Sequence, residues 1–136
     1  MAGPVKAKLK IDFVSDVSCP WCVIGLRAME QALAALDDVE AEVHFKPFEL
    51  NPDMGAEGQD LNEHITQKYG TTPEQSAATR EMIRERGAEL GFIFDREKYQ
   101  RIYNTFDTHR LLHWAALEAK QYALKTALFE AYFTEG

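Results

Sequence analysis

The stretch from Lys8 to Cys22, Lys-Leu-Lys-Ile-Asp-Phe-Val-Ser-Asp-Val-Ser-Cys-Pro-Trp-Cys, decides how the chain folds. Its first half alternates apolar and polar residues, as a half-buried β-strand does. A short polar loop follows. Pro20 then stands where a helix tolerates proline best, in the first turn, because the missing N–H would lack a helical partner there in any case. The stretch therefore predicts a strand that passes through a loop into a helix, with two cysteines at the junction.

Cys19 and Cys22 are the only cysteines of the chain. Two intervening residues on the first turn of a helix allow the two sulphur atoms to meet and to form a disulfide. The positive end of the helix dipole also favours a thiolate at Cys19. We expect Cys19 to be the nucleophile of a thiol–disulfide exchange and Cys22 to be the resolving thiol. Pro20 stiffens the turn, and Trp21 is either a partly exposed hydrophobe or a contact for an unfolded substrate.

The composition limits the classes of function. The chain has 136 residues, of which 46% are hydrophobic, enough for one domain or part of one. Its 15 Lys and Arg against 22 Asp and Glu give a net charge of −7, which argues against nucleic-acid binding. No apolar run is long enough for a membrane span, and residues 1–6 lack the apolar core of a secretory signal. We therefore expect a cytoplasmic protein, where a lone cysteine pair is more often catalytic or metal-binding than structural.

The remainder of the chain predicts a second strand and then helices. Residues 43–50 alternate as a strand does, and a strand–helix–strand unit of this length implies a right-handed crossover and a parallel pair. A turn-rich break at residues 51–58 follows, and everything after it has helical patterns. The expected helix starts are Asp60, Thr72 and Asp107, and the expected stops are Gly70 and Gly91. A further helical segment follows the Asp107 helix without a glycine or proline to mark the break.

Three motifs resemble those of one family. They are Ile11–Cys22, Phe48–Pro52 (Phe-Glu-Leu-Asn-Pro) and Tyr103–Leu111 (Tyr-Asn-Thr-Phe-Asp-Thr-His-Arg-Leu). Together they resemble the FrnE branch of the DsbA-like thioredoxin-fold proteins, which is related to 2-hydroxychromene-2-carboxylate isomerases and kappa-class glutathione transferases. The resemblance implies an α/β fold, a thioredoxin-like strand–helix–strand with an inserted all-helical domain. Residues 1–58 would form the N-terminal half of the thioredoxin-like domain, and residues 59–136 the helical insertion.

In that family a cis-proline loop, two more strands and a helix follow the insertion. They have no counterpart here, so the resemblance implies a chain that lacks these C-terminal strands and helix. A parallel pair of strands leaves edges and faces uncovered. We therefore expect either exchange with a second chain, as in a homodimer, or a thioredoxin half that is compromised by itself.

Two carboxylates lie near the cysteines in the sequence. Asp12 is on the strand that leads to the loop. It is either a buried acid that relays a proton, as in related folds, or an exposed strand carboxylate. Asp16 is in the loop itself, where we expect it to accept hydrogen bonds from backbone N–H groups.

The resemblance adds four candidate binding residues. In the glutathione-using relatives the third motif lies over the active site, which makes Asn104, His109 and Arg110 candidates for binding a substrate or a thiol ligand. Their residue types suit a peptide backbone and a carboxylate. The alternative is a capped helix start with a surface charge. Asn51 could shape the floor of the same cleft or simply end a strand.

The histidines raise the question of a metal. His109 and His113 are four residues apart on a predicted helix and would complete a Cys₂His₂ set with the cysteines. The alternative is a plain helical face, and we predict no metal. His44 and His64 are expected to be bystanders.

Thiol–disulfide exchange with protein or low-molecular-weight disulfides is the expected function. It needs no cofactor beyond the redox-active disulfide, with glutathione as a conceivable co-substrate. A glutathione-dependent isomerase or transferase is one alternative, although those relatives have serine at the position of Cys19. A non-enzymatic binding module with an aromatic surface is the other.

Overall fold

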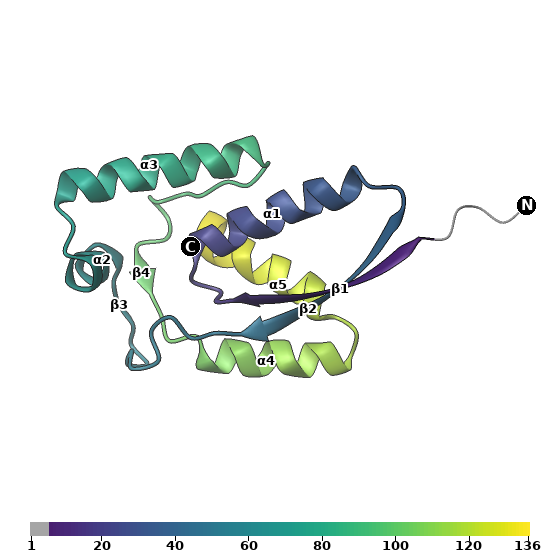
Figure 1. Ribbon diagram of the computed structural model, residues 1–136. Helices are drawn as coiled ribbons and strands as arrows, with labels where there is room; N and C mark the ends of the chain where they lie inside the picture. The colour runs from purple at the N-terminus through teal and green to yellow at the C-terminus, as the bar shows by residue number, and fades with distance from the viewer. Residues whose placement is uncertain (1–5) are drawn as a thin grey trace, which may run out of the picture.

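The computed structural model describes residues 6–136, so the prediction about a signal sequence concerns residues that lie largely outside it. The elements are β1 (Ala7–Ser15), α1 (Pro20–Ala34), β2 (Val39–Pro47), β3 (Gln59–Asp60), α2 (Leu61–Tyr69), α3 (Pro73–Glu89), β4 (Arg101–Ile102), α4 (Phe106–Leu117), α5 (Gln121–Glu130) and the π-helical turn η1 (Ala131–Glu135). In Figure 1, α1 lies above the β1–β2 pair and α4 lies below it, while α2 and α3 extend to one side. The α/β, thioredoxin-like architecture expected from the sequence is confirmed.

The first two strands form a parallel pair. Ile11 is paired with Val43 and Phe13 with Phe45, and α1 makes the crossover between the strands. The sequence placed the second strand at residues 43–50, which is wrong at both ends, because β2 begins at Val39 and ends at Pro47. Pro47 is paired with Ser15, and the following Phe48 N–H still donates to the Ser15 carbonyl at 3.1 Å.

The free edge of β2 is covered by a side chain of α5. The amide of Gln121 donates from Nε2 to the carbonyl of Phe45 at 3.1 Å and accepts from the Phe45 N–H through Oε1 at 3.1 Å. This amide makes the two hydrogen bonds that a further strand would make with Phe45. The contact fixes α5 against the strand pair and so determines where the other side chains of α5 point.

Helices α2 and α3 have the caps that the sequence predicts. The Asp60 carboxylate accepts from the N–H of Glu63 at 3.0 Å, and α2 ends at Gly70 with a φ of 62°. Thr72 and Gln75 form a reciprocal capping box at the start of α3. Local side-chain chemistry is therefore sufficient to begin and end these helices.

The start of α4 differs from the prediction. Asp107 is not its cap, because the helix already begins at Phe106. The Phe106 N–H is instead bound at 2.9 Å by Oδ1 of Asn104. The break between α4 and α5 falls at Ala119, whose φ of 57° is unusual for a residue with a side chain. Neither glycine nor proline marks that break, which is why the sequence left it open.

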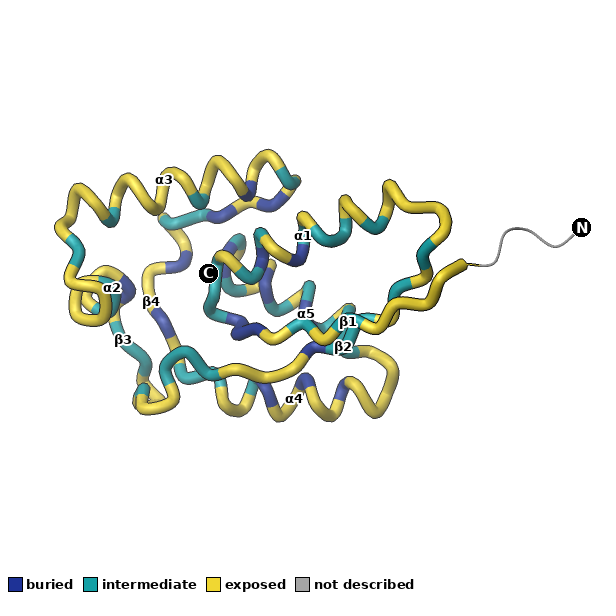
Figure 2. The backbone as a smooth tube through the Cα atoms, viewed as in Figure 1, coloured by how far each residue is buried: buried dark blue, intermediate teal, exposed yellow. Residues whose placement is uncertain are grey.

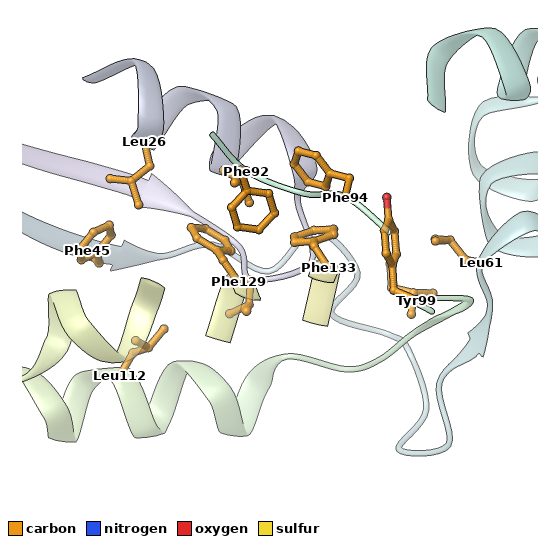
Figure 3. Packing of buried hydrophobic residues seen from close by; sticks show 12 residues of the cluster. Leu26, Phe45, Leu61, Phe92, Phe94, Tyr99, Leu112, Phe129 and Phe133 are labelled. Carbon is orange, nitrogen blue, oxygen red and sulfur yellow. The ribbon is translucent and has the colours of Figure 1, made fainter. Parts of the chain in front are cut away.

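A buried apolar cluster joins the early and late parts of the chain. Its members are Val17, Val23, Leu26, Phe45, Leu61, Phe92, Phe94, Tyr99, Ile102, Leu112, Phe129 and Phe133. Figure 3 shows Phe129 and Phe133 in the middle of this cluster, beside Phe92 and Phe94. The outer surface of α3, by contrast, is almost entirely exposed in Figure 2. The cluster draws on both sides of residue 58, and the division into two domains there stays a prediction.

Between residues 6 and 136, no helix has the length and apolar character required to cross a membrane.

Candidate redox site

The two cysteines lie where β1 has passed through its loop into α1. Cys19 is the N-cap of α1, with extended φ and ψ of −97° and 111°, and Pro20 is the first helical residue. The Cys19 N–H donates to the Asp16 carbonyl at 3.3 Å, and the Cys22 N–H donates to the Cys19 carbonyl at 3.2 Å. Both thiols are free and half-buried. Cys22 also packs against the apolar cluster.

The thiols share one proton. The hydrogen bond from Cys19 lowers the pKa of Cys22 to about 7, against the opposing effect of burial. The same hydrogen bond raises the pKa of Cys19 well above its usual value. The sequence placed the thiolate on Cys19 alone, whereas in the structure the first ionisation belongs to the pair. Backbone N–H groups of Trp21 and Cys22 stabilise the charge whenever it moves to Cys19.

Trp21 lies at the surface beside this pair, with 47% of its area exposed. A large aromatic side chain in that position can contact an incoming substrate, and it can report a change in the adjacent dithiol through its fluorescence. The structure leaves both sequence interpretations of Trp21 open, since exposure fits a surface hydrophobe and a substrate contact equally.

Asp16 is the buried acid of the site. It is 2% exposed, and its carboxylate accepts from the N–H of Val17 at 2.8 Å and of Leu50 at 2.9 Å. The sequence prediction that Asp16 binds backbone N–H groups is confirmed. Burial raises the pKa of Asp16, but the hydrogen bonds from His109 and Leu50 outweigh this and hold that pKa below its usual value. Asp16 is therefore a buried carboxylate that stays ionised.

His109 closes the same arrangement from α4. Its Nε2 lies 3.2 Å from Oδ1 of Asp16 and 3.1 Å from the carbonyl of Phe48. Since both partners are acceptors, Nε2 carries a hydrogen and donates to both. His109 is only 9% exposed. The residue that the resemblance suggested for ligand binding thus anchors the cysteine loop.

Asp12 is not the buried acid. Its side chain is 49% exposed and lies 4.0 Å from the ammonium of Lys10, also at the surface. The alternation of β1 turns Asp12 to the solvent, since it is on the opposite face from Ile11 and Phe13. The resemblance suggested a buried acid that relays a proton, and the exposure of Asp12 contradicts that role. The buried carboxylate of the cysteine loop is that of Asp16.

The other three binding candidates have local partners. The amide of Asn104 donates to the Met54 carbonyl at 2.8 Å and accepts from Phe106, so it fixes a loop. Arg110 is exposed and pairs with Asp107 at 3.1 Å. Oδ1 of Asn51 accepts from Lys68 at 2.8 Å. In this structure all three side chains are therefore engaged by other residues of the chain.

The structure does not bring His109 and His113 together toward the cysteines. His109 is directed to Asp16, while His113 is exposed on α4. Among the residues that the structure describes, no cluster of three or more His, Cys, Asp or Glu side chains is arranged to hold a metal ion.

A small cavity of about 280 Å³ opens beside the cysteine loop. Val17 and Ser18 form one wall, and Tyr103, Leu128 and Tyr132 contribute apolar surface. Ser18, which directly precedes Cys19, belongs to this lining.

Lys125 is the member of the site that sequence reasoning missed. It is 1% exposed on the inner face of α5, and its charge lowers the pKa of Cys22. A signal was present, because Lys125 occupies a position between Tyr122 and Phe129 on the apolar face of the helix. Lysine is rarely fully buried, so its place on the apolar face of a helix makes it a candidate functional residue.

A strand–loop–helix junction with two free thiols at the helix start is typical of the thioredoxin-like fold. The chain belongs to the DSBA-like thioredoxin domain family, whose model matches residues 10–136. A crystal structure of a probable DsbA oxidoreductase from Streptomyces coelicolor is similar, with a TM-score of 0.86 and 32% identity over 93% of this chain and 55% of that one. The uncharacterized protein YwbO of Bacillus subtilis (strain 168) is 28% identical over 127 residues, 92% of this chain and 56% of that protein. The chain spans about half the length of these relatives.

Proposed function

We propose that the protein is a thiol–disulfide oxidoreductase in which Cys19 attacks and Cys22 resolves. The observation that carries the proposal is the position of the pair: two free thiols lie at the start of α1, with Cys19 as its N-cap. The hydrogen bond from Cys19 lowers the pKa of Cys22 to about 7. The first ionisation belongs to the pair, and backbone N–H groups of Trp21 and Cys22 stabilise the charge on Cys19, where the thiolate can attack a disulfide.

The exchange proceeds in two steps. The Cys19 thiolate attacks one sulphur of a substrate disulfide, and the other substrate sulphur leaves as a thiolate. The Cys22 thiolate then attacks Cys19 in the mixed disulfide, which releases the second substrate thiol and leaves a Cys19–Cys22 disulfide. The substrate gains two electrons and the pair loses two; the reverse sequence oxidises a dithiol.

The motifs favour the FrnE branch of the family, with protein or low-molecular-weight disulfides as substrates. The cavity beside Ser18 supports substrates that carry an apolar side chain next to the disulfide. The direction of the reaction depends on the reduction potential of the pair, and disulfide isomerisation requires the same two thiols. A cytoplasmic setting, as expected from the sequence, would favour reduction.

Separate substitution of the two thiols tests the proposal. Cys19→Ser should abolish insulin reduction, because the attacking thiol is gone. Cys22→Ser should attack but not resolve, so that a covalent mixed disulfide with the substrate accumulates and can be detected by mass spectrometry. Equal activity in both variants and in the unsubstituted protein would show that the dithiol is not the reactive group.

A further inference from the structure

Lys125 has an environment that ordinary packing does not explain. It is 1% exposed, and its Nζ lies 5.0 Å from the ring centre of Phe129 and 5.8 Å from that of Phe45. Lysine is almost never buried to this extent without an anionic partner, because its ammonium is strongly hydrated in water. The faces of aromatic rings compensate only a part of the hydration free energy that a buried ammonium loses.

The Lys125 ammonium lies over the rings of Phe45 and Phe129, two members of the apolar cluster against which Cys22 packs. Within residues 6–136, Lys125 forms no ion pair with a carboxylate. Burial lowers the pKa of Lys125 to about 8, and the charges of Cys22, Asp16 and Cys19 oppose that effect. Asp16 already accepts hydrogen bonds from Val17, Leu50 and His109. The dithiol is therefore the anion whose charge changes during the reaction.

Lys125 also contributes to the lining of a groove. The groove has a volume of about 790 Å³ and lies between β2 and α4. The titratable and charged groups in this lining are His44, Lys46, Glu49, His109, Arg110 and His113. Glu49 is the one carboxylate among them, and the others are cationic or neutral. Glu49 forms no ion pair with Lys125 among the described residues.

We propose that Lys125 is a positioning residue of the redox pair, whose buried ammonium holds the thiolate charge and so favours the reduced dithiol over the disulfide. This inference concerns the same site as the proposed function, and its consequence for disulfide exchange rests on that function. When the pair reduces a disulfide, it loses two electrons and the remaining thiol proton, and the substrate leaves as one thiolate and one thiol. The ammonium loses its anionic neighbour in that step. Lys125 therefore makes the pair a stronger oxidant than the helix start alone would.

The test compares Lys125→Met with Lys120→Met. Methionine keeps much of the volume and removes the charge, and Lys120 is an exposed lysine at the start of the same helix. Two quantities are measured: the first pKa of the pair, by the ultraviolet absorbance of the thiolate, and the equilibrium constant with glutathione. Lys125→Met should raise that pKa by about one unit and shift the equilibrium toward the disulfide by about tenfold. Lys120→Met should change the equilibrium by less than about twofold.

Unchanged values in a folded Lys125→Met protein would overturn the proposal, and so would equal shifts in the two variants. If Lys125→Met does not fold, the proposal is tested in the unsubstituted protein, where NMR of the Lys125 side chain gives its pKa. Its pKa should be lower in the disulfide form than in the dithiol form, because the thiolate is then absent; identical pKa values contradict the coupling. These are equilibrium measurements, so a failure of insulin reduction would remove the proposed function and leave the coupling between Lys125 and the thiols measurable.

Discussion

The helix starts at Cys19 and at Thr72 are built in opposite ways. Thr72 caps α3 through a reciprocal pair of hydrogen bonds with Gln75, three residues away. Cys19 is the N-cap of α1, and its side chain makes no capping hydrogen bond. The loop before it is held instead by Asp16, whose partner His109 is 93 residues distant in the chain. A helix start that keeps its N–H groups available to a thiolate cannot also use them for a local cap, so its support comes from elsewhere in the fold.

Of the substitutions that test this comparison, removal of the Asp16 carboxylate is expected to change the free energy of unfolding most. Asp16→Ala removes the acceptor of three hydrogen bonds at a buried site. Their donors are the N–H groups of Val17 and Leu50 and the His109 ring. We expect the free energy of unfolding to fall by about 3 kcal/mol. Asp12→Ala, at the exposed strand position, should change it by less than about 0.5 kcal/mol. Urea denaturation measures both values.

The effect of Asp16 should also depend on pH. Its pKa is lowered in the folded protein, so its contribution is fully present above the pKa of an unfolded aspartate, about 4. The contribution is lost as the pH falls through the lower pKa of the folded state. The difference between the unsubstituted protein and Asp16→Ala should therefore shrink below about pH 4. A difference that stays constant through this range would contradict an ionised, hydrogen-bonded Asp16.

Loss of the local cap at Thr72 should have a smaller effect. Thr72→Ala removes the side-chain half of the capping box, with an expected loss of about 1 kcal/mol in the free energy of unfolding. Thr79→Ala is the matched control, because Thr79 is exposed inside α3, where alanine is the better helix former. Thermal or urea unfolding checks both variants, and a Thr72→Ala loss as large as that of Asp16→Ala would erase the contrast between the two helix starts.

This contrast also explains how much of the structure could be predicted. The caps of α2 and α3 and their glycine ends depend on neighbours within a few residues, and the sequence indicated them correctly. The parallel pair and its crossover helix follow from alternation and length in the same way. The start of α4 was misplaced because Asn104, which binds the Phe106 N–H, is itself held by the Met54 carbonyl 50 residues away, and a local pattern does not contain that partner.

Within the candidate site, the cysteine pair could be predicted and its surroundings could not. Cys19 and Cys22 are defined by their spacing at a strand–helix junction. The identity of the buried acid requires the direction of the loop, which turns Asp16 inward although the strand turns Asp12 outward. The burial of Lys125 depends on α5, which is positioned by the contact of Gln121 with the edge of β2. Such placements arise from tertiary packing, and a single sequence carries little trace of them.

The redox equilibrium of the cysteine pair tests the central claim most directly. The protein is equilibrated in glutathione buffers of varied ratio, quenched with acid and alkylated, and the state of Cys19 and Cys22 is read by mass spectrometry. We predict a single two-electron transition from two free thiols to an intramolecular Cys19–Cys22 disulfide, independent of protein concentration. Thiols that remain reduced in every buffer, or that form only glutathione adducts or disulfides between chains, would contradict the assignment of this pair as a redox centre.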